Sequence, residues 1–166
     1  MQKSKVFRIL PDEPWLKIDK LFTRSGIKSR IKDNDIVAIK LHFGELGNTR
    51  YIHPIFARKI VELVKEAGGR PFLTDTTTLY KRARHTLFDY LETAAKNGFT
   101  RESMGCPILI ADGLHGTNGQ WVELESFNKF KRVKVAQSIY EADFLISLAH
   151  ITFHPDAGFS GSLKNV

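Results

Sequence analysis

The chain has 166 residues, 42% hydrophobic and 26% charged, a composition typical of one globular domain with a buried core. Its single cysteine, Cys106, excludes an intrachain disulfide and any zinc or iron–sulfur site built from four cysteines of this chain. The net charge of +7 raises the question of nucleic acid, but the basic residues are spread out and carry no nucleic-acid motif, so we do not expect this partner. We find neither a signal-peptide pattern nor a run of roughly 20 apolar residues, which predicts a cytoplasmic protein without membrane contact.

The first half of the chain predicts two strands and two helices. Lys5 to Leu10 alternates in polarity and is predicted to be a first strand. Apolar residues then recur at helical spacing from Trp15 to Arg24. Ile36 to Leu41 is almost continuously apolar, as expected for a parallel strand covered on both faces. A helix from Ile55 to Ala67 follows Pro54 and ends at a pair of glycines.

The second half continues the alternation of strands and helices. We predict strands at Pro71 to Thr74, Pro107 to Ala111 and Phe144 to Leu148, a helix at Leu87 to Lys96, a helical turn at Ile139 to Ala142, and short strands near Trp121 and at Arg132 to Ala136. The alternation indicates a single α/β domain, residues 1–166, with a mostly parallel central sheet and helices on both faces.

Polar side chains follow four of these strands. His42, Glu45 and Arg50 follow the strand at Ile36; Asp75 and Thr76 the next; Asp112 and His115 the third; and His150, His154, Ser160, Lys164 and Asn165 the last. The carboxyl ends of parallel strands meet at one edge of a sheet, where ligands bind in open α/β folds. We therefore predict a polar ligand-binding site at this edge.

The histidines suggest a metal site or acid–base groups. Imidazole is the commonest side-chain metal ligand and titrates near neutral pH, so His42, His150 and His154 are our candidate metal ligands. The alternative is that these rings hydrogen-bond loop backbone. The spacing of His150 and His154 suits one face of a helix, but Pro155 argues against a helix there.

The segment from Gly158 to Asn165 combines glycines, hydroxyls and Lys164, which suggests an anion or phosphate subsite. The alternative is a turn before a helix. Asp75, Thr76 and Asp112 are candidates for contacts to a cation or a substrate hydroxyl, with helix capping as their alternative role. Cys106 is expected to be an inert, partly buried thiol.

Five segments together resemble a known family. They are Val37 to Pro54 (VAIKLHFGELGNTRYIHP), Glu66 to Tyr80, Asn97 to Phe99, Pro107 to Gly116 and Ala142 to Asn165. The chain is similar to the uncharacterised iron–sulfur-centre proteins of domain of unknown function family 362. The resemblance implies an α/β core, followed in many members by a ferredoxin-like segment with cysteines for two four-iron clusters. This chain contains no such segment, and its end at Val166 favours a truncated member over a naturally short one.

Within the family motif, members often carry lysine, glycine and histidine after the first histidine, where this chain has Ile151-Thr152-Phe153-His154. His150, His154, Lys164 and Asn165 still match. We therefore expect the ligand- or metal-binding core of an iron–sulfur-associated redox or maturation protein, acting on a small molecule or anion with a redox partner protein. The alternative is a noncatalytic module that binds a phosphate-bearing small molecule or a partner protein. The resemblance implies no specific reaction.

Overall fold

A four-stranded parallel sheet organises the molecule. The computed structural model describes residues 4–9, 14–125, 129–154 and 158–166. The strands of the main sheet are β1 (Ile36–Lys40), β2 (Arg70–Asp75), β3 (Ile108–Ile110) and β6 (Phe144–Ser147), in the order β3-β2-β1-β6. All three pairings between them are parallel. The predicted α/β fold with a mostly parallel sheet is confirmed.

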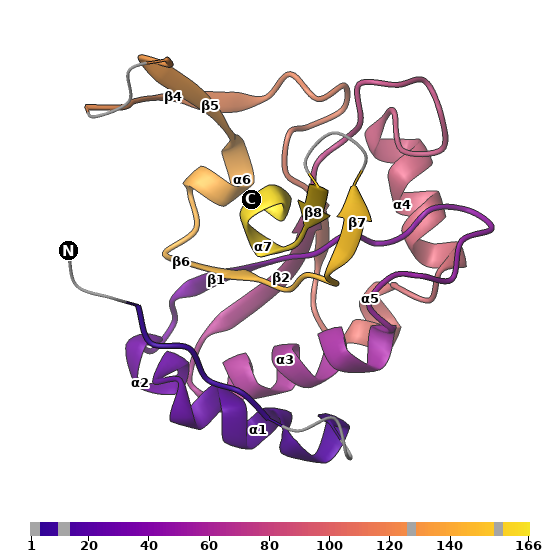
Figure 1. Cartoon of the computed structure of the whole chain (residues 1–166). Coiled ribbons are helices and arrows are strands. Elements are labelled where there is room, and N and C mark those ends of the chain that lie inside the picture. Colours follow the sequence, from indigo (N-terminus) through magenta and orange to yellow (C-terminus); the bar gives the residue numbers. More distant parts are fainter. Residues whose placement is uncertain (1–3, 10–13, 126–128, 155–157) are drawn as a thin grey trace.

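Helices lie on both sides of this sheet (Figure 1). They are α1 (Pro14–Arg24), α2 (Ile27–Arg30), α3 (Pro54–Glu66), α4 (Leu87–Lys96), α5 (Arg101–Met104), α6 (Gln137–Tyr140) and α7 (Ser162–Asn165). In Figure 1, α1, α2 and α3 lie below the sheet, whereas α6 and α7 lie above it. No helix in the described ranges is long and apolar enough to cross a membrane.

The core lies on the face of the sheet that α3 covers. Val37, Ile39 and Leu41 alternate with the residues of the other face and are fully buried in one cluster with Val61 and Val64 of α3. These two elements match the predicted strand and helix to within a residue or two. The helix begins where His53 accepts a hydrogen bond from the Ile55 amide, with Pro54 in the first turn.

Two small antiparallel sheets stand apart from the main one. β4 (Gly119–Glu123) pairs with β5 (Arg132–Ala136), and β7 (Thr152–His154) pairs with β8 (Gly158–Ser160). The sequence predicts no strand after Leu148, so β7 and β8 were missed. Cross-strand pairs such as Phe153 with Phe159 form a hairpin there, and a helical turn, α7, follows it.

The prediction of a strand at residues 5–10 was wrong. Residues 4–9 form no strand, and Leu10 lies outside the described residues. Val6 is 91% exposed, so the alternation of this segment does not correspond to a buried sheet face. Alternating polarity over six residues predicts an extended chain, but it does not supply a neighbouring strand.

Candidate functional site

A cavity of about 840 Å³ lies at the carboxyl ends of β1, β2 and β6. Its walls come from the last residues of β1 and β2 and from the segments that follow β1, β2 and β6, including β7, β8 and α7. The lining residues are 40, 42, 45, 48 and 50–52 from β1 onward; 75–80 and 84 from β2 onward; and 148–150, 152–154, 160, 161, 164 and 165 after β6. This is the sheet edge at which open α/β proteins bind ligands, and the volume is in the range of small-molecule sites. We take this cavity as the candidate site.

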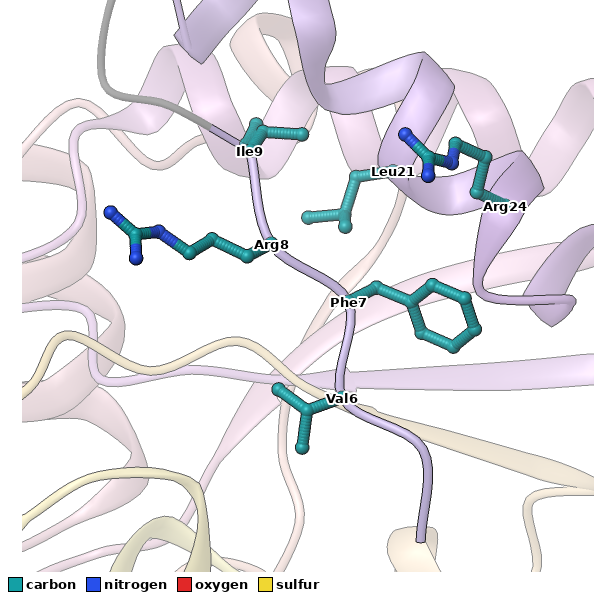
Figure 2. Close-up of a pocket in the computed structure, with 6 residues that line it drawn as sticks. All are labelled: Val6, Phe7, Arg8, Ile9, Leu21 and Arg24. Carbon is teal, nitrogen blue, oxygen red and sulfur yellow. The ribbon is translucent and has the colours of Figure 1, made fainter.

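A smaller hollow of about 110 Å³ lies between the N-terminal segment and α1. Figure 2 shows its six lining residues, four from residues 6–9 and two from α1. Apart from Arg8 and Arg24, this lining is apolar. It has none of the histidines, carboxylates or hydroxyls that surround the larger cavity.

A buried ion pair forms the floor of the larger cavity. The ammonium group of Lys40 lies 2.8 Å from Oδ1 of Asp75, and the two residues are only 7% and 5% exposed. The hydroxyl of Tyr90, from α4, donates to the other oxygen of Asp75. Burial of Tyr90, followed by the nearby Asp75 charge, raises the pKa of its hydroxyl well above the ordinary value. The phenol therefore stays protonated and serves as a donor to Asp75.

Asn165 connects this floor to the C-terminal part of the chain. Its Oδ1 accepts a hydrogen bond from Lys40 Nζ at 3.3 Å, and its Nδ2 donates to the Lys40 carbonyl at 3.1 Å. The same Nδ2 lies 3.2 Å from the hydroxyl of Ser147 at the end of β6. One amide side chain therefore holds α7 against the ends of β1 and β6.

A second polar cluster joins the loops after β1 and β2. Nη2 of Arg84 donates to the carboxylate of Glu45 and to the hydroxyl of Tyr80. The guanidinium of Arg84 also lies over the rings of Tyr80 and Tyr90, 5.7 and 5.5 Å from their centroids. Partial burial disfavours the charged form of Glu45, but the Arg84 cation and the hydrogen bonds from Tyr80 and Arg84 together outweigh burial and lower the pKa of the carboxyl. Glu45 is therefore an anion at neutral pH.

His42 is held as a neutral hydrogen-bond donor. Its Nδ1 accepts the Gly44 amide at 2.8 Å, which leaves the ring hydrogen of the neutral form on Nε2. Partial desolvation, followed by the charge of Arg84, lowers the pKa of His42, although part of the residue remains exposed. A neutral ring of this tautomer can donate from Nε2 to a ligand oxygen. Ligation of a metal by Nε2 would require the ring hydrogen on Nδ1, where the Gly44 amide opposes it.

Phe43 fixes the loop that carries His42 and Glu45. Its ring is fully buried, with centroids 5.7 Å from Tyr90 and 5.3 Å from Phe99. Gly44, with φ of 88°, adopts a left-handed conformation, and a Cβ there would lie 2.5 Å from the ring of Tyr51. The aromatic anchor and the glycine turn together set the direction of the neighbouring polar side chains.

The structure places most of the predicted site residues around this cavity. Those that line it are His42, Glu45, Arg50, Asp75, Thr76, His150, His154, Ser160, Lys164 and Asn165. Asp112 and His115, in the loop after β3, do not line it. Asp112 instead accepts hydrogen bonds from the amide and hydroxyl of Thr77, so it supports the loop after β2. His115 is exposed.

Within the described part of the chain, no three His, Cys, Asp or Glu side chains are grouped closely enough to hold a metal ion. The predicted ligands His42, His150 and His154 nevertheless line one cavity. Burial raises the pKa of the Cys106 thiol to about 11, which agrees with the expectation of an inert thiol.

Sequence reasoning missed four residues of the two polar clusters: Lys40, Tyr80, Arg84 and Tyr90. Lys40 could have been found, because it lies within an apolar run that was predicted to be a buried strand. A lysine is rarely buried unless it is paired, so its position predicts a counter-ion nearby. Arg84 gave none. It belongs to a run of basic residues, 81–85, that has the composition of a solvated segment, and only the fold shows that it is 7% exposed.

Comparison with known proteins gives one match, to a family model. No curated protein and no solved structure matches the chain significantly. The family is described as "Domain of unknown function (DUF362)", and its model matches residues 37–166, which include every residue that lines the cavity. Because the match covers well over half of the chain, the chain belongs to this family of unknown function, DUF362.

Proposed function

We propose that this chain is a ligand-binding core whose cavity at the sheet edge holds a small anionic molecule. The observation that carries the proposal is the charge of the cavity lining. Among the described residues, four lining cations, Lys40, Arg50, Arg84 and Lys164, accompany two carboxylates, Glu45 and Asp75. Each carboxylate is ion-paired with a cation of the same lining, so the cavity retains an excess of positive charge.

Neutral donors add to this charge. His42 presents Nε2–H, and the hydroxyl-bearing residues Thr76 and Ser160 also line the cavity. Charged and neutral donors around one cavity suit an oxyanion, because carboxylate and phosphate oxygens accept several hydrogen bonds at once. The proposal thus combines the ligand-binding role with the anion contact predicted for Lys164.

We expect isothermal titration to detect binding of at least one of three probes: inorganic phosphate, pyrophosphate or succinate. Lys164→Ala should weaken that binding by about three- to tenfold, because it removes one charge-assisted contact from an exposed position. Lys28→Ala is the matched control, since it removes an exposed lysine from α2, which does not line the cavity. Absence of binding of all three probes, or equal weakening in the two variants, would contradict the proposal.

The metal site predicted at the histidines needs its own measurement. We predict that elemental analysis of chain purified without added metal will find about one equivalent of iron, nickel or zinc if His150 and His154 are ligands. The double variant His150→Ala/His154→Ala should then lose that metal. Retention of the same metal by the double variant would refute the assignment.

The family resemblance implies an association with iron–sulfur clusters, and we propose that these clusters lie outside this chain. One cysteine cannot supply the ligands of a four-iron cluster. In a redox or maturation role, this chain would therefore bind the anionic ligand, and a separate cysteine-bearing segment or a redox partner protein would carry the clusters.

A further inference from the structure

We propose that Arg84 is the primary receptor of the anionic ligand and that Glu45 occupies it until the ligand arrives. This inference rests on the proposed function and adds the atoms that recognise the anion. Arg84 lines the cavity and is only 7% exposed. Its Nη2 has two acceptors, whereas its Nε is buried and has no hydrogen-bond partner in the described structure.

The unpaired Nε defines the chemistry of the missing partner. In a guanidinium, Nε–H and one Nη2–H lie on the same edge and point in parallel, so they can bind two oxygens of one carboxylate or phosphate. Glu45 contacts Nη2 through Oε1 and leaves Nε without an acceptor. A buried donor that lacks an acceptor destabilises the structure, and an oxyanion with two free oxygens would satisfy both donors.

The two partners of this ion pair differ in how firmly they are held. The Arg84 side chain is 8% exposed and packs over the rings of Tyr80 and Tyr90. The Glu45 side chain is 38% exposed and lies in a loop between Gly44 and Gly47, which both have positive φ. Turning outward would break the bonds of Glu45 to Arg84 and to the Tyr80 hydroxyl, but the carboxylate would be hydrated in exchange, whereas the guanidinium would stay in the wall. Departure of the Glu45 carboxylate would free the Nε–Nη2 edge of Arg84 for a ligand.

Competition between Glu45 and the ligand predicts the direction in which the ligand affinity changes when Glu45 is substituted. If the carboxylate of Glu45 blocks the receptor in most molecules, only the remaining fraction binds, and the apparent affinity is reduced by that fraction. Glu45→Gln removes the competing charge, so we expect it to tighten binding of succinate or pyrophosphate by about tenfold. A purely structural role of the ion pair predicts the opposite sign, because loosening the two loops would weaken binding.

The test is a set of titrations with succinate and with pyrophosphate on the whole chain. Glu62→Gln is the matched control: Glu62 is also ion-paired, on α3 away from the cavity, and its loss should change the affinity by less than about twofold. Arg84→Lys keeps the charge but loses the paired donors, so it should weaken binding by about tenfold or more. In the Arg84→Lys background, Glu45→Gln should gain less than about threefold.

The outcomes separate this proposal from the proposed function. Tighter binding of either probe by Glu45→Gln that is mostly lost in the Arg84→Lys background supports the receptor assignment, and the probe that responds shows whether the ligand group is a carboxylate or a phosphate. A gain that persists in that background overturns the assignment, because removal of a carboxylate from the lining favours an anion bound anywhere in the cavity. Equal or weaker binding overturns the assignment, while Lys164-dependent binding by the unmodified chain would still support the anion cavity. Failure of both the unmodified chain and Glu45→Gln to bind any probe overturns both. If Arg84→Lys does not fold, the absence of tightening by Glu45→Gln still overturns the assignment.

Discussion

Asp75→Ala is expected to lower the free energy of unfolding by about 3–5 kcal/mol, because it leaves the buried Lys40 ammonium without its counter-ion. The two charged atoms are 2.8 Å apart, and both side chains are less than 10% exposed. The variant also removes the acceptor of the Tyr90 hydroxyl. Urea unfolding at pH 7, followed by circular dichroism, measures the loss.

Two comparisons separate this effect from the loss of an ordinary surface pair. Glu92→Ala breaks an ion pair with Lys96 whose side chains are more than half exposed, and it should cost less than about 0.5 kcal/mol. The double variant Lys40→Met/Asp75→Leu removes both charges and should recover most of the lost stability. A loss below about 1 kcal/mol for Asp75→Ala would show that Lys40 is solvated and that the pair is not a buried one.

Phe43→Ala should cost about 3–5 kcal/mol, because it opens a space among fully buried rings that cannot close completely. Phe43 packs against Tyr90 and Phe99, and its carbonyl accepts a hydrogen bond from Asn97 at 2.9 Å. Its neighbours His42 and Glu45 depend on this anchor for their direction. We therefore expect anion affinity to fall together with stability, as measured by unfolding and by titration of the same preparation.

Phe88→Ala provides the matched control. Phe88 lies in α4, like Tyr90, but is 69% exposed, so its removal should cost less than about 0.5 kcal/mol and leave anion affinity unchanged. Phe43→Leu keeps an apolar side chain in the core and should retain more stability than Phe43→Ala. Similar losses for Phe43→Ala and Phe88→Ala would contradict the assignment of Phe43 as the anchor.

The parallel sheet was predictable because its strands carry a strong local signal. The apolar run at residues 36–41 and the glycine stop after α3 define a strand and a crossover helix from adjacent residues alone. The N-terminal segment and the final hairpin were not predictable in this way. Whether an extended segment becomes a strand depends on a partner, and neither residues 5–10 nor residues 152–160 identify theirs by composition.

The position of the candidate cavity followed from the same logic, since parallel strands place their trailing loops at one edge. The loops after β1, β2 and β6 line the cavity, whereas Asp112 supports the wall from outside it. The sequence could not show that Arg84 is buried, because its burial requires Tyr80, Tyr90 and Glu45 to surround it. Contacts over such distances along the chain carry no periodic signal.

The contact of Asn165 with Lys40 has a kinetic and dynamic consequence. The two residues are 125 positions apart, so the cavity becomes complete only after nearly the whole chain has folded. The hairpin of β7 and β8 has its strand pairing within itself, outside the main sheet. Such a segment can open as a unit while β1 and β2 remain intact, and its amides then exchange with solvent long before those of the core. A ligand that binds only when β7 and β8 are in place would slow the exchange of their amides. Slower amide exchange in β7 and β8 would therefore report that the cavity is occupied.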